Sequence, residues 1–248
     1  MSEPATHFGF TDIDPAEKAD RVGQVFSSVA SRYDVMNDLM SFGSHRLWKD
    51  LAVARSGVRT GDHVLDVAAG SGDMSARFAK RVGPTGRVVM TDINPDMLGC
   101  GRARLMDQGI GSNVRMLLSD AEALPFSPDQ FNCVSIAFGL RNVTRIPKAL
   151  ASMTRMLRPG GRVMILEFSA PTSALWAKAY DLFSFSVIPK LGRAVTGDED
   201  SYRYLVESIR RHPDQETLAG MMRDAGLEDV TYQNIHGGIV AIHTGFRY

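Results

Sequence analysis

A short apolar segment that runs directly into a glycine-rich turn constrains the fold of this chain more than any other feature. Residues 63–69 (HVLDVAA) are short, apolar and rich in Val, which predicts a buried strand. The turn at 70–72 (GSG) follows, and helical spacing runs from about 74 to 81. A strand, a glycine-rich turn and a helix in this order place a ligand site at the end of the strand.

Strand-like and helix-like segments alternate beyond this turn. Further strands are predicted at 87–92, 114–120, 133–139, 162–169, 228–235 and 238–248, and helices near 95–108, 147–157 and 215–225. Alternation of this kind predicts a doubly wound α/β fold. We expect a mostly parallel, seven-stranded sheet.

Two regions lie outside the alternation. Apolar residues at helical spacing in 16–29 and 46–57 predict that residues 1–60 form an N-terminal helical cap. Residues 170–213 follow the fifth strand and are too long for a loop and too aromatic for a linker. We interpret them as a helical insertion that covers the substrate, within one domain spanning 1–248.

Composition and charge exclude several classes of function. The 28 basic and 28 acidic residues give a formal net charge of zero, which argues against a nucleic-acid substrate. The two cysteines and six scattered histidines form no zinc pattern, so we expect no metal. The first residues show no export signal, and no apolar run approaches the ~18 residues of a membrane span. We therefore expect a cytoplasmic protein.

Acidic residues stand at the ends of three consecutive strands. Asp66 ends the first, Asp92 the second, and Asp120 the third. Open α/β sheets bind ligands at this edge, and carboxylates accept hydrogen bonds from ribose hydroxyls. The alternative for each aspartate alone is a helix cap. A dinucleotide-binding turn would need a third glycine where Ser75 stands, so the pattern favours S-adenosylmethionine over a nicotinamide cofactor.

Long stretches of the chain resemble the ubiquinone/menaquinone biosynthesis C-methyltransferase family. The matching stretches are 25–49, 92–98 (DINPDML), 120–126 (DAEALPF), 137–143 (AFGLRNV), 157–169, 180–192, 201–218 and 237–245. The resemblance implies a Rossmann-like class I S-adenosylmethionine-dependent methyltransferase. Its expected reaction is C-methylation of a polyprenyl benzoquinol and, in some members, of demethylmenaquinol. Residues 6–10 and 28–43 look most like members that serve ubiquinone.

The resemblance also implies which residues touch the cofactor. These are Ser71, Asp92, Asp120, Ala121 and Ala137. Ser71 stands where the family usually has Thr and keeps a hydroxyl, whereas Ala137 stands where relatives often have Ser and leaves only a backbone contact. The turn and the strand ends add Asp66, Gly70, Gly72 and Ile93 to the predicted cofactor-binding residues.

Methylation of a ring carbon requires positive charge or a base near the acceptor. A phenol with a pKa of ~10 is ~3 units from ionising at neutral pH, or roughly 4 kcal/mol. Arg141, just past the fourth strand, is the leading candidate to stabilise a phenolate, directly or through a water. Asn142 is predicted to orient the ring oxygen. The alternative for Arg141 is a structural salt bridge.

Other residues remain open between catalytic and structural roles. Glu167 ends the fifth strand and is a candidate base. The remaining candidates are Tyr33, Asp34, His45, Tyr202 and Arg203.

A lipidic acceptor implies peripheral association with the inner face of the membrane. We place that contact at Phe183, Phe185, Val187 and Ile188. Other quinone-biosynthesis enzymes and further copies of the chain are compatible partners. The alternatives are a non-catalytic S-adenosylmethionine-binding accessory protein, a methyltransferase for another small aromatic acceptor, and a nicotinamide dehydrogenase. Nucleic-acid methylation is also opposed by the lack of an Asn-Pro-Pro-Tyr type motif after the fourth strand.

Overall fold

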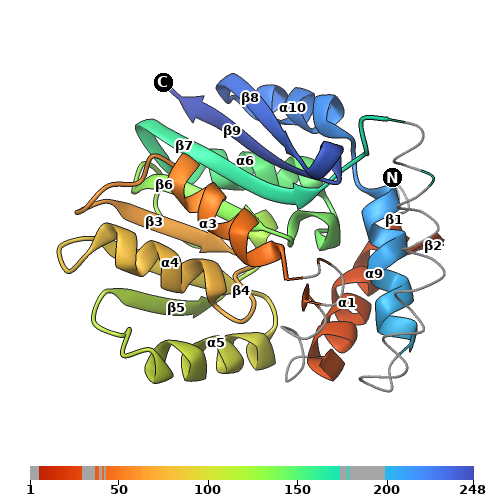
Figure 1. Ribbon diagram of the computed structural model, residues 1–248, viewed down its shortest axis with the longest axis horizontal. Helices are drawn as coiled ribbons and strands as arrows, with labels where there is room; N and C mark the ends of the chain where they lie inside the picture. Colours follow the sequence, from red (N-terminus) through yellow and green to blue (C-terminus); the bar gives the residue numbers. More distant parts are fainter. Residues whose placement is uncertain (1–5, 30–36, 39–40, 42, 174–177, 179–198) are drawn as a thin grey trace.

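A seven-stranded sheet forms the centre of the structure. The computed structural model describes residues 6–29, 37–38, 41, 43–173, 178 and 199–248. The strands of the sheet are β3 (His63–Val67), β4 (Arg87–Asp92), β5 (Val114–Leu118), β6 (Phe131–Ala137), β7 (Leu157–Phe168), β8 (Glu228–Ile235) and β9 (Val240–Arg247). Their order is β5-β4-β3-β6-β7-β9-β8 (Figure 1). The strands from β5 to β7 pair in parallel, and β9 runs antiparallel to β7 and β8, so the predicted sheet is confirmed.

Helices cover both faces of the sheet. The α-helices of the described residues are α1 (Pro15–Val29), α3 (His45–Arg55), α4 (Asp73–Val82), α5 (Pro95–Asp107), α6 (Ile146–Met156), α9 (Glu199–Arg211) and α10 (Gln215–Asp224). Short 3-10 turns lie at η2 (Ala121–Ala123), η3 (Leu140–Asn142) and η4 (His236–Gly238). Helices α3, α4 and α5 pack on one face, and α6 and α10 on the other. Because both faces are covered, adjacent Val64 and Leu65 of β3 are both fully buried.

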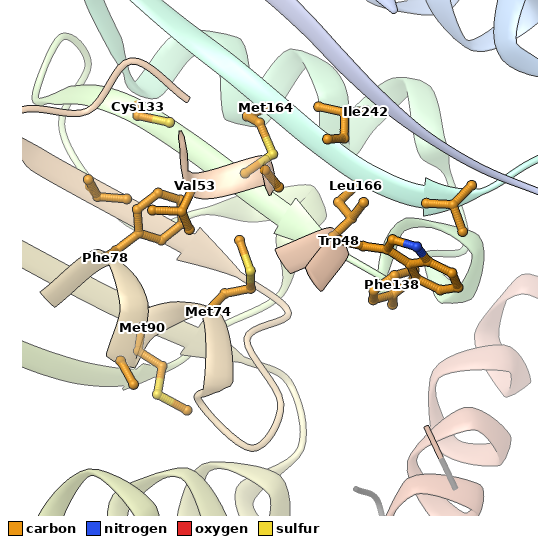
Figure 2. Close-up of a cluster of buried hydrophobic side chains, with 14 of the residues drawn as sticks. Trp48, Val53, Met74, Phe78, Met90, Cys133, Phe138, Met164, Leu166 and Ile242 are labelled. Atoms are coloured by element: carbon orange, nitrogen blue, oxygen red, sulfur yellow. The ribbon is translucent and has the colours of Figure 1, made fainter. Parts of the chain in front are cut away.

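The core is divided between the two faces. On the face of α3 and α4, Trp48 and Phe78 pack against Met90 and Met164 of the sheet (Figure 2). On the opposite face, strand residues pack against α6 and α10. Each fully buried large side chain contributes about 1.5–3 kcal/mol relative to exposure, so the two layers together hold the strand ends rigidly in register.

The chain begins with a β-hairpin, which corrects the prediction of a wholly helical first sixty residues. Strands β1 (Thr6–Phe8) and β2 (Thr11–Ile13) pair antiparallel around Gly9. Gly9 has a φ of +58°, a left-handed conformation that favours glycine. Helical structure begins at Pro15, a residue suited to the first position of a helix. The prediction of helical structure is therefore correct for α1 and α3 and wrong for the hairpin.

The predicted insertion at 170–213 is described only in part. Residues 174–177 and 179–198 lie outside the described residues, and so do the predicted membrane contacts Phe183, Phe185, Val187 and Ile188. Helix α9 confirms that the last part of the insertion is helical and packs against η3. Figure 1 shows α9 and α1 gathered beyond the carboxyl ends of the parallel strands. These two helices therefore enclose the edge where α/β sheets bind ligands.

Candidate active site

A pocket opens at the carboxyl ends of β3, β4 and β6, with α1 forming one wall. Five predicted cofactor-binding residues line it: Gly70, Asp92, Ile93, Asp120 and Ala121. Asn142, predicted to contact the acceptor, also lines it. The strand ends that the sequence singled out therefore do converge on one site.

Asp92 at the end of β4 places a carboxylate in the pocket wall. Its Oδ2 accepts a hydrogen bond from the Gly70 amide at 2.8 Å, and its Oδ1 accepts one from the Asn94 amide at 2.9 Å. Burial raises the pKa of Asp92, and these amides act in the opposite direction. Because each carboxylate oxygen has two lone pairs, both oxygens can accept a further hydrogen bond from a ligand hydroxyl.

The turn after β3 brings backbone close to the pocket. Gly70 has a φ of +56°, and a Cβ placed on it would lie 3.2 Å from Cε of Met97. Gly72 has a φ of +74°, and its Cβ would lie 3.3 Å from Cα of Gly101. Both positions thus combine a left-handed conformation with close contacts, which favours glycine.

Asp66, predicted to bind the cofactor, lies under the pocket and does not line it. The hydroxyls of Ser75 and Ser135 donate to its carboxylate at 2.6 and 3.3 Å, which ties β3 to α4 and β6. Burial raises the pKa of Asp66 to about 7, although the two hydroxyls lower it. Three further predicted cofactor residues lie outside the lining: Ser71, Gly72 and Ala137. Direct contact of these four residues with a cofactor stays a prediction.

The segments after β4 and β5 supply both polar and apolar surface to the pocket. Asp120 caps η2, its Oδ1 accepting from the Glu122 amide at 2.9 Å, and Ala121 is buried in the pocket wall. Ile93 and Met97 line the same pocket, and Ile93 is 47% exposed. Apolar side chains beside a carboxylate suit a flat heteroaromatic ring joined to a ribose. The residues that line the pocket fit S-adenosylmethionine, which carries a heteroaromatic ring and a ribose and has no phosphate.

Asn142 is fixed in the pocket wall by the insertion. The hydroxyl of Tyr204, on α9, donates to Oδ1 of Asn142 at 2.9 Å. Burial raises the pKa of Tyr204, so this hydroxyl keeps its proton at neutral pH. Asp92 and Asn142 follow β4 and β6, the two neighbours of β3, so they lie on either side of the glycine turn.

Arg141 forms a buried ion pair with Glu167. A structural salt bridge is the alternative role that the sequence leaves open for Arg141. Its Nη1 donates to Oε1 of Glu167 at 2.7 Å and to the carbonyl of Phe138 at 2.6 Å. Both side chains are almost completely buried, and the guanidinium lies 5.5 Å from the centre of the Phe168 ring. Neither partner lines this pocket; Arg141 lines a second cavity. A direct catalytic role for either residue stays a prediction.

The remaining candidates are placed elsewhere. His45 is buried, and its Nε2 pairs with Oδ1 of Asp38 at 2.9 Å. Tyr202 is fully buried in the core, whereas Arg203 is exposed and pairs with Glu199 one turn earlier on α9. None of the three lines the pocket, and residues 30–36, which include Tyr33 and Asp34, lie outside the described residues.

Sequence reasoning missed the wall that α1 contributes. Val22 and Phe26 line the pocket, although helical spacing alone indicated only an apolar face. Asn94 connects this wall to the sheet: its Nδ2 donates to the Gly23 carbonyl at 3.0 Å, while its Oδ1 caps α5. The Asn-Pro pair that opens α5 is a helix-start signal, but a cap signal does not reveal the second contact.

Two pocket residues outside the glycine turn adopt left-handed backbone conformations. Ala68 has a φ of 49° and Phe138 a φ of 55°, and they follow β3 and β6. Such conformations in residues other than glycine cost on the order of 1–3 kcal/mol and persist where the surroundings impose them. The Arg141 bond to the Phe138 carbonyl supplies one such restraint.

In the part of the chain that the structure describes, no group of three or more His, Cys, Asp or Glu side chains is placed to hold a metal ion. No helix among those same residues combines the length and apolarity required to cross a membrane.

The fold is that of the class I S-adenosylmethionine-dependent methyltransferases. A methyltransferase of this type from Aquifex aeolicus superposes with a TM-score of 0.59 at 16% identity, covering 95% of this chain and all of that one. A Haemonchus contortus phosphoethanolamine N-methyltransferase, solved with S-adenosyl-L-methionine, gives 0.59 at 15% identity over 80% of this chain and 52% of that one. At such identities the likeness concerns the fold alone.

The sequence comparisons identify the family. The model of the ubiE/COQ5 methyltransferase family matches residues 15–247. The ubiquinone/menaquinone biosynthesis C-methyltransferase UbiE of Pseudomonas fluorescens (strain SBW25) is 55% identical, and that of Pseudomonas aeruginosa (strain LESB58) is 56% identical. Each match covers 99% of this chain and 96% of the relative. The chain therefore belongs to the ubiE/COQ5 methyltransferase family.

Proposed function

We propose that this protein transfers a methyl group from S-adenosylmethionine to a ring carbon of a polyprenyl benzoquinol in ubiquinone biosynthesis. Demethylmenaquinol, the corresponding precursor of menaquinone, is proposed as a second acceptor. The observation that carries the proposal is the pocket, in which the Asp92 carboxylate and the fixed amide of Asn142 lie beside apolar walls. The relatives at 55–56% identity are C-methyltransferases of ubiquinone and menaquinone biosynthesis, which supports acceptors from these two pathways.

The pocket is suited to hold two reactants in line. Bound S-adenosylmethionine supplies an electrophilic methyl group, which a ring carbon must approach to ~3 Å opposite the sulfur. Asp92 is proposed to accept both ribose hydroxyls, since its two oxygens are already oriented by backbone amides. Asn142, across the glycine turn, is then proposed to bind a ring oxygen of the quinol.

Activation of the ring requires a negative charge on a neighbouring oxygen. We propose that Arg141 lowers the pKa of the acceptor hydroxyl through its charge and holds the pocket wall through the Phe138 carbonyl. The pairing with Glu167 reduces the first effect, because the carboxylate neutralises most of that charge. The positioning effect is retained, because the bond to Phe138 does not depend on a free charge.

Peripheral association with the membrane follows from a lipidic acceptor and remains a proposal. Flotation of the protein with liposomes that contain a polyprenyl quinol is the test. Enrichment in the lipid fraction supports it, and a protein that stays at the bottom of the gradient with and without quinol contradicts it. Association with other enzymes of quinone biosynthesis, and with further copies of the chain, is proposed on the same ground.

Mass spectrometry of quinone intermediates in a strain lacking this protein tests the function. We expect accumulation of the benzoquinol without the ring methyl, reversed by the wild-type gene and not by an Asp92→Ala, Asn142→Ala double variant. Accumulation that the double variant also reverses would favour a non-catalytic accessory protein. A normal quinone profile would contradict the proposal.

A further inference from the structure

A second cavity, of about 560 Å³, lies beside the candidate active site. It opens between β1, the start of α1, the segment from η3 into α6, and the turn after α9. Five cationic side chains line it: Lys18, Arg141, Arg145, Lys148 and Arg211. Among the described residues that form this lining there is no Asp or Glu. We propose that this cavity binds the phosphate group of a ligand.

The carboxylate partners of the lining cations lie outside the cavity. Arg141 pairs with Glu167, Arg145 with Glu122 and Arg211 with Asp12, and none of these three carboxylates is part of the lining. Among the described residues, the charged side chains of the lining are therefore all cationic. A phosphate in the cavity would meet guanidinium and ammonium donors, the groups that bind phosphate most strongly in proteins.

Lys18 is a buried cation of the lining for which an anionic ligand would be most favourable. Its side chain lies in the lining, yet the residue is only 2% exposed, and its Nζ donates to the carbonyl of Val143 at 3.1 Å. Burial lowers the pKa of Lys18 to about 8, so it still carries its proton at neutral pH. No ion pair to Lys18 is formed within the described part of the chain. The charge of Glu122 favours the protonated form of Lys18, but Glu122 forms no ion pair with it. A buried ammonium without such a pair is costly, and a bound phosphate would offset that cost.

Unused hydrogen-bonding atoms point to the same conclusion. Both ring nitrogens of His212 are buried without a partner in the described structure, and so are Nδ1 of His7 and Nε of Arg141. All three residues line the cavity. Such unmade hydrogen bonds are rare in folded proteins and call for an explanation such as an absent ligand. The N–H groups among these atoms can donate to the acceptor oxygens of a phosphate.

The N-terminus of α6 also faces the cavity. Arg145 is the N-cap residue and makes no side-chain cap, while Ile146, Pro147 and Lys148 of the first turn line the cavity. The first turn of a helix carries a partial positive charge that favours anions. This feature alone would not define a site, but it adds to the buried cations and the unmade hydrogen bonds.

The cavity is separate from the pocket proposed for the acceptor, although Arg141 in its lining is proposed to act on the acceptor hydroxyl through its charge. A quinol is neutral and has no group for five cations, and the two cavities share only Val143 and Thr144. The inference does not rest on the proposed function, because it concerns binding and not methyl transfer. The phosphate could belong to an anionic lipid headgroup or to a soluble phosphoester, and the experiment distinguishes these two sources.

The test removes two exposed cations of the cavity, Lys148→Gln and Arg211→Gln, in one double variant. Lys80→Gln and Arg102→Gln, two exposed cations on α4 and α5, form the matched control because they remove the same charge elsewhere. Calorimetry with inorganic phosphate and with glycerol 3-phosphate measures soluble ligands. Flotation with phosphatidylglycerol vesicles, against phosphatidylcholine vesicles, measures the lipid source. Thermal unfolding confirms that both variants are folded.

We expect the cavity variant to bind roughly tenfold or more weakly than the wild type, and the control within about twofold. Saturable binding of glycerol 3-phosphate that the cavity variant loses supports the site with a soluble ligand. Binding to phosphatidylglycerol vesicles alone, lost in the cavity variant, supports it with a lipid. Absence of binding to every probe by the wild type, or equal losses in the cavity and control variants, would overturn the proposal.

Discussion

The ends of β4 and β7, which β3 and β6 separate in the sheet, hold their carboxylates in different ways. At the end of β4, Asp92 is held by backbone amides and faces the pocket, so its oxygens remain available to a ligand. At the end of β7, Glu167 is held by Arg141 and both lie outside the pocket. Amides orient a carboxylate without neutralising it, whereas a guanidinium neutralises it. The first arrangement therefore suits binding and the second suits support of the pocket wall.

The largest expected effect comes from breaking the Arg141 ion pair. Arg141→Ala leaves Glu167 as an unpaired buried carboxylate, and losing one partner of such a pair costs about 3–5 kcal/mol of unfolding free energy. Urea unfolding followed by circular dichroism measures it. A loss below about 1 kcal/mol would show that the pair does not support the fold.

Replacing both partners separates stability from catalysis. The double variant Arg141→Met, Glu167→Leu removes both charges and should recover most of the lost stability, because apolar replacements of buried pairs are often neutral. If the charge of Arg141 also acts on the acceptor, kcat of this variant stays low and rises with pH as the phenol ionises unaided. If the double variant keeps the wild-type kcat, the role of Arg141 is limited to support of the structure.

The next-largest effect is expected on the affinity for S-adenosylmethionine. Asp92→Ala should weaken S-adenosylmethionine binding by about 3 kcal/mol, on the order of a hundredfold, because two charge-assisted hydrogen bonds are lost. Calorimetry gives the affinity, with Asp107→Ala on the exposed end of α5 as the control. Asp92→Asn, which keeps one acceptor oxygen, should fall in between. Equal affinities for the Asp92→Ala variant and the wild type would contradict the assignment.

Asp66 predicts a pH dependence of stability. Its pKa in the folded protein is raised to about 7, so the folded state holds a proton that the unfolded state has released. The contribution of Asp66 to the unfolding free energy should therefore be greatest below pH 4. It should fall by on the order of 2 kcal/mol between pH 5 and pH 7. Asp66→Asn should remove this fall. Parallel pH profiles for the wild type and the Asn variant would count against it.

The smallest effect tests the support of Asn142. Tyr204→Phe removes the hydroxyl that donates to Oδ1 of Asn142 and should lower kcat by roughly tenfold, about the contribution of one hydrogen bond. The affinity for S-adenosylmethionine should not change, because the Tyr204 hydroxyl bonds to Asn142 and the Phe variant keeps the ring that stacks on Phe8. A change in cofactor affinity with unchanged kcat would reverse this assignment.

The sheet and much of the pocket could be predicted because their signals are local. The strands appear as short apolar runs, and Asp92 and Asp120 end two of them. The predicted strand begins at 162, five residues after the observed start of β7 at Leu157, because the continuous apolar run begins only after the turn-favouring residues Pro159 and Gly160. In the structure, pairing with β6 continues past this turn through an irregularity between Phe131 and Cys133.

The rest depends on contacts between residues distant in sequence. Arg141 and Glu167 meet only after β6 and β7 pair, so the sequence left the ion pair as one of two alternatives. The α1 wall was missed because an amphipathic pattern identifies a buried face and not what that face covers. The β1–β2 hairpin was missed because strands of three residues carry almost no periodic signal.

Methyl transfer by the purified protein is the most direct test of the account. The enzyme is incubated with S-adenosylmethionine labelled in its methyl group with deuterium and with a polyprenyl benzoquinol that lacks the ring methyl. The account predicts a product that carries the labelled methyl on a ring carbon, formed by the wild type and strongly reduced in the Asp92→Ala and Asn142→Ala variants. Label on a ring oxygen, or no transfer by a folded protein that binds S-adenosylmethionine, would contradict it.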